Sequence, residues 1–116
     1  MSAITLYGIK NCDTVKKARR WLDDNGIPYH FHDVRTDGLD AARVDAWLQE
    51  LGLDLINRRS TSWKALDEQT RDALNVDNAR DVILAQPTLI KRPLLDAGGV
   101  RHVGFKPAEY QALLKA

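Results

Sequence analysis

Cys12 is the only cysteine in the chain, and it lies in the stretch YGIKNCDTVKKAR, where a β-prone segment ends and a helical pattern begins. At the start of a helix, the positive end of the helix dipole and the free backbone N–H groups favour a thiolate. Lys10 and Lys16 add positive charge, whereas Asp13 opposes this effect. The thiolate is the nucleophilic form of cysteine, and the same N–H groups can hold an anionic substrate. The position of Cys12 therefore suits a nucleophile.

The residues around Cys12 leave two interpretations open. Free cysteine is often buried as a small hydrophobic side chain, and a lone cysteine is more often structural than reactive. Here polar Asn11 and Asp13 flank the thiol in a loop, which favours contact with solvent. Thr14, in the first helical turn, could donate a hydrogen bond to the sulfur or to a bound oxyanion. The loop is thus a candidate substrate site.

A strand followed by a helix must position this loop. Residues 3–8 alternate and are β-prone, so they predict a strand that ends at Gly8. From Thr14 onward, Val15, Ala18 and Leu22 recur with helical spacing, and Gly26 is a plausible stop. Residues 29–34 predict a second strand, which should be a parallel neighbour of the first through a right-handed crossover.

The rest of the chain predicts three further helices, two strands and a closing helix. The helices are expected over residues 39–51, over 62–74 with Ser62 as the cap, and from Asp77 to the residue before Pro87. Strands over 94–96 and 100–105 are joined by an Ala-Gly-Gly turn, and the last helix has Pro107 in its first turn. The fold class is therefore α/β: a mixed four-stranded sheet flanked by helices, with a helical insertion between the second and third strands.

Length and composition predict one ordinary globular domain over residues 1–116. The chain has 44% hydrophobic and 28% charged residues and a formal net charge of +1, which gives no field for binding nucleic acid or a membrane surface. We expect neither partner, and we expect a monomer. The start of the sequence has no signal-peptide pattern, and one cysteine cannot form an internal disulfide, so we expect a cytoplasmic protein.

Three groups of residues have a structural interpretation that we prefer. His30 and His32 alternate on one strand and His102 lies on another, but without an acidic or cysteine third ligand we expect a partly exposed sheet face and no metal site. The tryptophans at positions 21, 47 and 63 have core spacing and are expected to pack. Lys17, Arg19 and Arg20 are expected to form a solvated face of the first helix.

The cysteine loop is followed late in the chain by an Arg-Pro pair directly before a strand. This pairing, with the stretches LINRRSTSWKAL, PTLIKRPLL and VGFKPAEY, resembles the arsenate reductase (ArsC) family of the thioredoxin-like fold, most closely its YffB-type branch. The resemblance spans nearly the whole chain. It implies a thiol-dependent oxidoreductase that uses Cys12 as the attacking thiol.

The resemblance also implies roles for residues far from Cys12 in the sequence. Arg92 matches the family arginine that contacts the oxyanion and the sulfur, and Pro93 matches a proline that this fold holds in cis. Arg59, with Arg58 as the alternative, matches the anion-binding arginine of the helical insertion. Lys16 and Lys106 stand at positions where arsenate reductases have arginines.

Those two lysines and Val15 separate this chain from its relatives. Lysine presents a point charge where arginine presents a planar fork, which weakens the case for arsenate itself. Val15 replaces the second cysteine of a C-x-x-C motif, so an external thiol must regenerate the enzyme. We expect no bound cofactor and glutathione as co-substrate, with a small anionic or disulfide substrate. The alternatives are an arsenate reductase proper, or a non-catalytic interaction module like the Spx regulators, which usually carry C-x-x-C.

Overall fold

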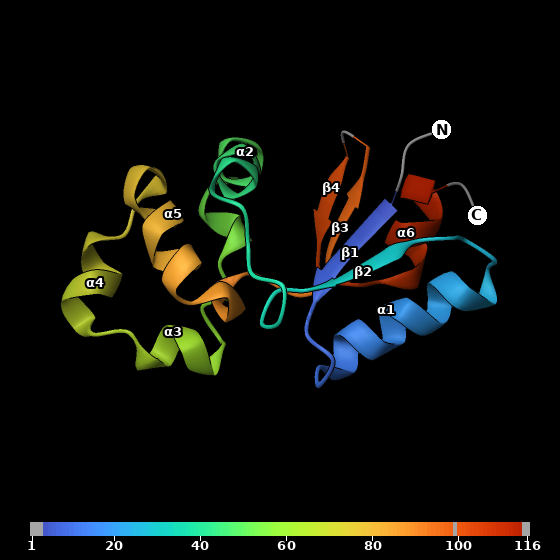
Figure 1. The fold of residues 1–116 in the computed structure, drawn as a ribbon, viewed down its shortest axis with the longest axis horizontal. Helices are drawn as coiled ribbons and strands as arrows, with labels where there is room; N and C mark the ends of the chain where they lie inside the picture. The colour runs from blue at the N-terminus through green and yellow to red at the C-terminus, as the bar shows by residue number, and fades with distance from the viewer. Residues whose placement is uncertain (1–3, 99, 115–116) are drawn as a thin grey trace. The chain divides into compact units, whose positions relative to one another are not determined.

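The computed structural model describes residues 4–98 and 100–114, and the chain divides into two compact units (Figure 1). The sheet unit comprises Met1–Asp33 and Arg92–Ala116, and the helical unit comprises Val34–Lys91. The helical unit is inserted between the second and third strands of the sheet unit, as predicted. The single domain expected over residues 1–116 stays a prediction.

The sheet unit is built on four strands in the order β2-β1-β3-β4. Their bounds are Ile4–Gly8 for β1, His30–Asp33 for β2, Leu94–Ala97 for β3 and Arg101–Val103 for β4. The pair β1/β2 is parallel, and the pairs β1/β3 and β3/β4 are antiparallel, so the predicted mixed sheet is confirmed. β2 and β4 are shorter than predicted. Ala3 of the first predicted strand and Gly99 of the predicted turn lie outside the described residues.

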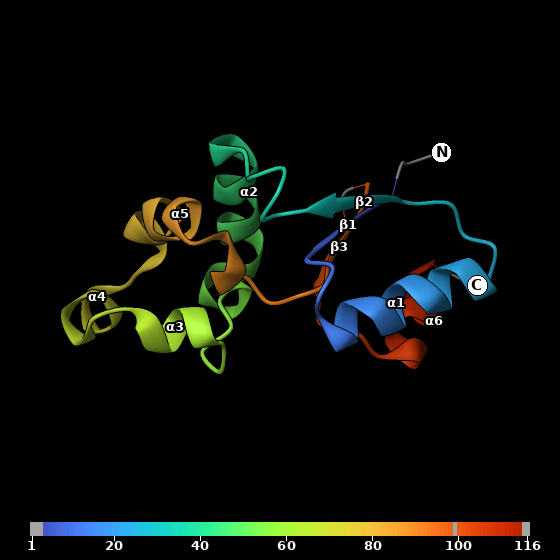
Figure 2. The same ribbon diagram turned by 60° about the horizontal axis from the view of Figure 1, so that its bottom comes forward.

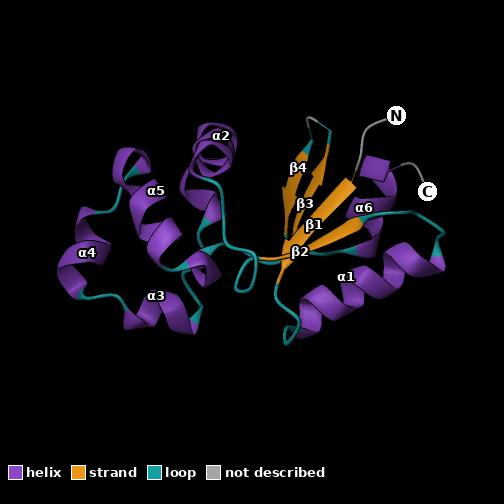
Figure 3. Ribbon diagram, in the orientation of Figure 1, coloured by secondary structure: helices purple, strands orange, loops and turns teal. Residues whose placement is uncertain are grey.

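Two helices, α1 (Asp13–Asp24) and α6 (Pro107–Leu114), belong to the sheet unit (Figures 1 and 3). Both pack on the same face of the sheet. Val15, Ala18 and Leu22 are the buried residues of α1, which confirms the helical periodicity read from the sequence. Neighbouring strands contribute Leu6 and Leu95, which lie opposite each other in the register. The buried cluster joins both layers and consists of Leu6, Ala18, Leu22, Leu95 and Tyr110.

The helical unit contains four α-helices and two short 3-10 helices within the described residues (Figure 2). They are α2 (Ala41–Leu51), η1 (Gly52–Leu55), α3 (Thr61–Ala65), α4 (Glu68–Ala73), α5 (Val76–Ala85) and η2 (Pro87–Leu89). Its buried core includes Trp47, Leu55 and Ile83. The predicted packing of Trp47 is thereby confirmed, whereas Trp63 is only half-buried and lies under the guanidinium of Arg58, 5.7 Å from the ring centroid.

The single helix predicted over residues 62–74 is wrong. The chain forms two helices there because it contains two caps: the Ser60 side chain accepts a hydrogen bond from the Trp63 backbone, and the Asp67 side chain accepts one from the Thr70 backbone. A side chain that caps a helix satisfies one of its free N–H groups and so defines where it starts. Ser62 is not the cap, because it lies inside α3.

The predicted start of the next helix at Asp77 is also wrong. α5 begins one residue after Asn75, which forms a reciprocal capping box with Asn78. Each side chain accepts a hydrogen bond from the other residue's backbone N–H, at 3.0 Å and 2.8 Å. Because this arrangement satisfies two N–H groups at once, it outcompetes a start at Asp77. The helix ends at Ala85, before Pro87, as predicted.

Among residues 4–98 and 100–114, every helix falls short of the length and apolar character that crossing a lipid bilayer requires.

We expect Tyr110 to make the protein sensitive to high pH. Its ring is fully buried, its hydroxyl has no hydrogen-bond partner among the described residues, and burial raises its pKa well above the usual range. The unfolded chain ionises this group near pH 10, whereas the folded chain does not. The contribution of the un-ionised Tyr110 side chain to the free energy of unfolding is therefore fully present below about pH 10. It is lost as the pH rises toward the pKa of this group in the folded protein.

The measurement is the free energy of urea unfolding of the wild type and of Tyr110→Phe at several pH values. Below pH 10 the difference between the two proteins should be constant. Above about pH 10 the wild type should lose stability relative to the variant by up to about 1.4 kcal/mol per pH unit. Parallel pH profiles up to pH 11.5 would contradict the assignment.

Candidate functional site

Cys12 occupies the N-cap position of α1. Its backbone is extended, with φ of −124° and ψ of 121°, and its side chain makes no capping hydrogen bond. Its carbonyl accepts the first helical hydrogen bond, from the Lys16 backbone N–H at 2.9 Å. The residue is partly exposed, so the interpretation of Cys12 as a buried hydrophobic side chain is wrong. The thiol thus lies beside backbone N–H groups of the first turn that it does not itself cap.

The loop that carries Cys12 is anchored by close packing between Gly8 and Val15. Gly8 ends β1, and a Cβ atom placed on it would lie 2.7 Å from Cγ2 of Val15. Val15 is fully buried. The position that holds the second cysteine of a C-x-x-C motif is therefore a core position here, where valine packs the first turn of α1 against the end of β1.

We expect Gly8→Ala to destabilise the protein by about 1–3 kcal/mol, because the added methyl group overpacks the contact with Val15. The measurement is the free energy of urea unfolding. In a double-mutant cycle, the cost of Gly8→Ala should be much smaller in a Val15→Ala background, where the colliding methyl groups are absent. Additive costs would show that this contact does not position the loop.

The strand register places several predicted site residues at one end of the sheet. Leu94, the first residue of β3, pairs with Tyr7 near the end of β1 and with Val103 at the end of β4. The segments that carry Cys12, Arg92 and Lys106 therefore all adjoin the same end of the sheet (Figure 1). Residues 92, 93 and 106 are 80 or more positions from Cys12 in the sequence, and only the sheet brings their segments together.

The peptide bond between Arg92 and Pro93 is cis, which confirms the prediction from the family resemblance. Pro93 is buried, and its carbonyl accepts a hydrogen bond from the Gly104 backbone N–H at 2.9 Å. This hydrogen bond connects the segment before β3 to the segment after β4. The backbone next to Arg92 is thus fixed to the segment that leads to α6.

Arg92 has an unsatisfied donor. The residue is half-buried, and its Nε is buried without a hydrogen-bond partner among the described residues. A buried N–H group without a partner costs roughly 1–3 kcal/mol, and more when the group is charged. An anionic ligand at this end of the sheet would supply the missing acceptor through a charge-assisted hydrogen bond.

The other predicted site residues divide between the two units. Around Cys12, the residues at positions 10, 11, 13, 14 and 16 are all exposed. Lys106 is exposed, and its carbonyl accepts hydrogen bonds from the backbones of Glu109 and Tyr110, so it fixes the start of α6. Arg59 belongs to the helical unit, where its side chain is exposed and its backbone N–H donates to Oδ1 of Asn57 at 3.0 Å. Its expected role in anion binding stays a prediction.

The expected solvated face of the first helix is confirmed for Lys17 and Arg20 but not for Arg19. Arg19 is half-buried: its guanidinium lies 4.2 Å from the centroid of the Phe31 ring, and its Nε donates to the Tyr29 hydroxyl at 3.1 Å. This arginine connects α1 to β2. It is therefore a structural residue.

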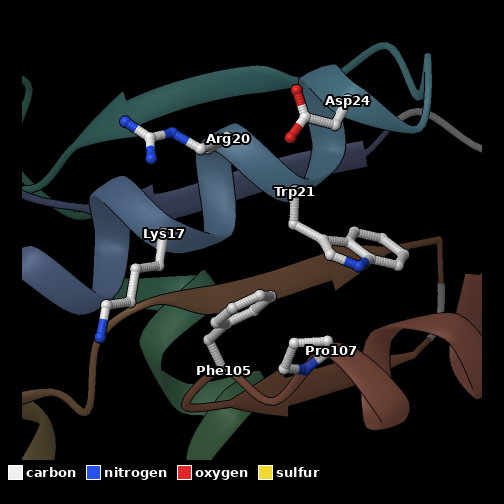
Figure 4. Close-up of a pocket in the computed structure, with 6 residues that line it drawn as sticks. All are labelled: Lys17, Arg20, Trp21, Asp24, Phe105 and Pro107. Atoms are coloured by element: carbon white, nitrogen blue, oxygen red, sulfur yellow. The ribbon is translucent and has the colours of Figure 1, made fainter.

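The sheet unit also contains a groove that was not predicted from the sequence (Figure 4). It has a volume of about 240 Å³, and its lining residues come from α1, from the segment between β4 and α6, and from the first residue of α6: Lys17, Arg20, Trp21, Asp24, Phe105 and Pro107. The spacing of positions 17, 20, 21 and 24 marks one helix face, which is a signal in the sequence. The contribution of Phe105 and Pro107 depends on tertiary packing and gives no such signal.

His30 and His32 lie on one face of the sheet, and His102 lies on the other. His30 is exposed, and the ring of His32 packs on Tyr7 with centroids 4.8 Å apart. His102 lies opposite Leu95, on the face covered by the helices, and its Nε2 is 2.9 Å from Oε1 of Glu109. Among the residues that the structure describes, no three His, Cys, Asp or Glu side chains come together in a way that could hold a metal ion.

The mixed sheet, the helices packed on one face and the cysteine at the start of α1 define a thioredoxin-like protein. A glutaredoxin from Archaeoglobus fulgidus shares this fold with a TM-score of 0.50 at 12% identity, covering 100% of this chain and 89% of the glutaredoxin. At the level of family, residues 7–113 match the model of the ArsC family. The chain therefore belongs to the ArsC family.

Several relatives resemble the chain over nearly their whole length. An uncharacterized protein of Haemophilus influenzae is 49% identical over 110 residues, which cover 94% of this chain and 96% of that protein. The solved structure of a YffB protein is 45% identical, with a TM-score of 0.90 and coverage of 95% and 97%. An arsenate reductase (ArsC) related protein from Brucella melitensis is 48% identical, with a TM-score of 0.76 and coverage of 98% and 96%.

Two more distant matches have different names. The global transcriptional regulator Spx 2 of Lactococcus lactis is 29% identical over 114 residues, which cover 96% of this chain and 86% of the regulator. An arsenate reductase from Vibrio cholerae is 18% identical, with a TM-score of 0.79 and coverage of 98% and 97%, and this likeness shows the fold alone.

Proposed function

We propose that this protein is a glutathione-dependent monothiol reductase in which Cys12 is the nucleophile. One observation carries the proposal: the partly exposed thiol at the start of α1 adjoins the sheet end that also carries Arg92, whose buried Nε has no partner. A thiol beside free N–H groups and an unsatisfied guanidinium suit a substrate that is anionic or becomes so during reaction.

The proposed reaction consists of two thiol–disulfide exchanges. The Cys12 thiolate attacks one sulfur of a mixed disulfide between glutathione and a substrate thiol, which forms a Cys12–glutathione disulfide and releases the substrate as a thiolate. A second glutathione thiolate then attacks the glutathione sulfur of that disulfide. This step releases oxidised glutathione and regenerates the Cys12 thiolate. In each turnover the mixed disulfide is reduced to the substrate thiolate, one glutathione thiolate is consumed, and its sulfur joins the glutathione unit of the mixed disulfide in oxidised glutathione; the enzyme is unchanged.

A second thiol is not needed in this cycle, and the chain does not provide one. Val15 stands at the position of a resolving cysteine and is buried, so regeneration must come from an external thiol. Arg92 is proposed to contact the attacked disulfide and a carboxylate of glutathione, and Lys10, Lys16 and Lys106 to add positive charge. Arg59 is proposed to assist in anion binding.

Two other functions are compatible with the family. Arsenate reduction is supported by the names of several relatives, but the lysines at positions 16 and 106 offer point charges where a planar fork would suit an oxyanion better. Transcriptional regulation is supported by the likeness to Spx proteins. The missing second cysteine removes the C-x-x-C that those regulators usually carry, so we favour the enzyme.

The test is a turnover assay with purified protein and glutathione as the only reductant. The substrates are the mixed disulfide of glutathione and 2-mercaptoethanol, a panel of other small disulfides, and arsenate. We expect turnover of the mixed disulfide and a Cys12 adduct of one glutathione in the mass spectrum. Turnover of arsenate alone would replace the proposal with arsenate reduction. Inactivity toward all substrates would favour a non-catalytic regulator.

A further inference from the structure

A second depression lies next to the groove of Figure 4, nearer the start of α1. It is also about 240 Å³ in volume and is lined by Asp13, Lys16, Lys17 and Arg20. Lys17 and Arg20 line both depressions. We call the two depressions together the track. The track begins at the residue after Cys12 and ends between α1 and the start of α6.

The middle of the track is positively charged. The side chains of Lys16, Lys17 and Arg20 are exposed and form no ion pair or hydrogen bond with any residue in the described part of the chain. Asp13 and Asp24 lie at the two ends of the track. The cations are thus available to an external anion, and the acidic residues confine the favourable position of that anion to the middle.

Beside Asp24, the far end of the track has an apolar platform that packs on the core. Trp21 and Phe105 line it, and both rings pack edge-to-face on the buried ring of Tyr110, with centroids 5.7 Å and 4.7 Å away. In Figure 4 the indole of Trp21, the ring of Phe105 and the ring of Pro107 lie around one space. Because Tyr110 is fixed in the core, this platform is rigid and suits one aromatic or large aliphatic side chain.

The length of the track indicates what kind of ligand would fill it. With a rise of about 1.5 Å per residue, Lys17 lies about 8 Å and Trp21 about 14 Å beyond Cys12 along α1. An extended peptide covers about 3.3 Å per residue. A peptide whose cysteine is at Cys12 would therefore place residues two and three positions away among the cations, and a residue four positions away on the apolar platform.

We infer that this track recognises a protein substrate: an acidic segment in which a glutathione-linked cysteine lies two and three residues from acidic side chains and four residues from an aromatic one. The inference rests on the proposed function and specifies its substrate class. Glutathione alone has carboxylates but no apolar side chain for the platform. In the reaction, Cys12 attacks the glutathione sulfur, and the substrate cysteine leaves as a thiolate while its peptide occupies the track.

The experiment compares synthetic peptides as glutathione mixed disulfides. The acidic peptides are Cys-Gly-Glu-Glu-Phe and its reverse sequence, and the controls replace Glu with Lys or Phe with Ala. We expect kcat/KM for one acidic peptide to exceed that for its Lys control by at least tenfold and that for its Ala control by severalfold. Lys17→Glu and Arg20→Glu should each lower the ratio of kcat/KM for the peptide to kcat/KM for the small disulfide by about tenfold. The control is Lys64→Glu, an equal charge change on an exposed residue of the helical unit. This control should leave kcat/KM unchanged for both substrates.

A binding measurement separates this inference from the proposed function. Fluorescence anisotropy records binding of the same peptides, with Ser in place of Cys, to Cys12→Ser protein, in which no exchange can occur. Acidic preference here would support the track even if no disulfide were turned over. Equal binding of the acidic and Lys peptides, or equal effects of Arg20→Glu and Lys64→Glu, would overturn the inference, even if the mixed disulfide of 2-mercaptoethanol were still reduced.

Discussion

Replacing Cys12 with serine should abolish glutathione-dependent turnover and at the same time make the protein slightly more stable. A serine hydroxyl is a far weaker nucleophile than a thiolate, and loss of the nucleophile lowers kcat on the order of 10³-fold or more. The N-cap side chain of α1 is unused in the wild type. Serine is a preferred N-cap residue, so it should stabilise the helix by about 0.5–1 kcal/mol.

The opposite signs of these effects make the prediction specific. Activity is measured by turnover of the glutathione mixed disulfide, and stability by urea unfolding. Cys12→Ala is the matched control: it should lose the same activity but gain no stability, because alanine cannot cap. Residual turnover above one tenth of the wild-type rate in either variant would contradict the assignment of the nucleophile. A stable Cys12→Ala protein with no gain in Cys12→Ser would contradict the geometry of the cap.

Arg92→Lys should lower kcat/KM by about tenfold or more, although it keeps the positive charge. Lysine has no counterpart to Nε and cannot present a planar fork, so it loses the unsatisfied donor that we assign to the substrate. Arg92 is proposed to contact the substrate while its disulfide lies near Cys12. The substitution should therefore change both kcat and KM. Steady-state kinetics with the mixed disulfide of glutathione and 2-mercaptoethanol measure it.

Arg71→Lys is the control for this substitution. Arg71 lies on α4 of the helical unit, and its side chain donates an exposed hydrogen bond to the Lys64 carbonyl at 3.4 Å. We expect no change in kinetics from this variant. If Arg92→Lys and Arg71→Lys had equal kinetic effects while circular dichroism showed both proteins folded, Arg92 would have no direct role in the site.

The elements of the sheet unit could be predicted from the sequence because their signals are local. Alternation in β1, the spacing of Val15, Ala18 and Leu22 in α1, and Pro107 at the start of α6 each depend on a few neighbouring residues. The family resemblance added what local patterns do not contain, including the cis bond before Pro93. Within the helical unit the local signals competed. Serine and aspartate occur at several possible caps, and the caps at Ser60, Asp67 and Asn75 prevailed through hydrogen bonds that a pattern does not rank.

The sequence by itself determined that a lone thiol stands between a strand and a helix, without a second cysteine to pair with, because both facts depend on residue order alone. Only the tertiary structure decided what surrounds that thiol. The antiparallel pairing of β1 with β3 brings the segment of Arg92 to the same end of the sheet as the Cys12 loop, and the packing of Tyr110 places Phe105 beside Trp21. These neighbours are set by hydrogen-bond register and core packing between residues about 80 positions apart, and separations of that kind leave no periodic signal in a sequence.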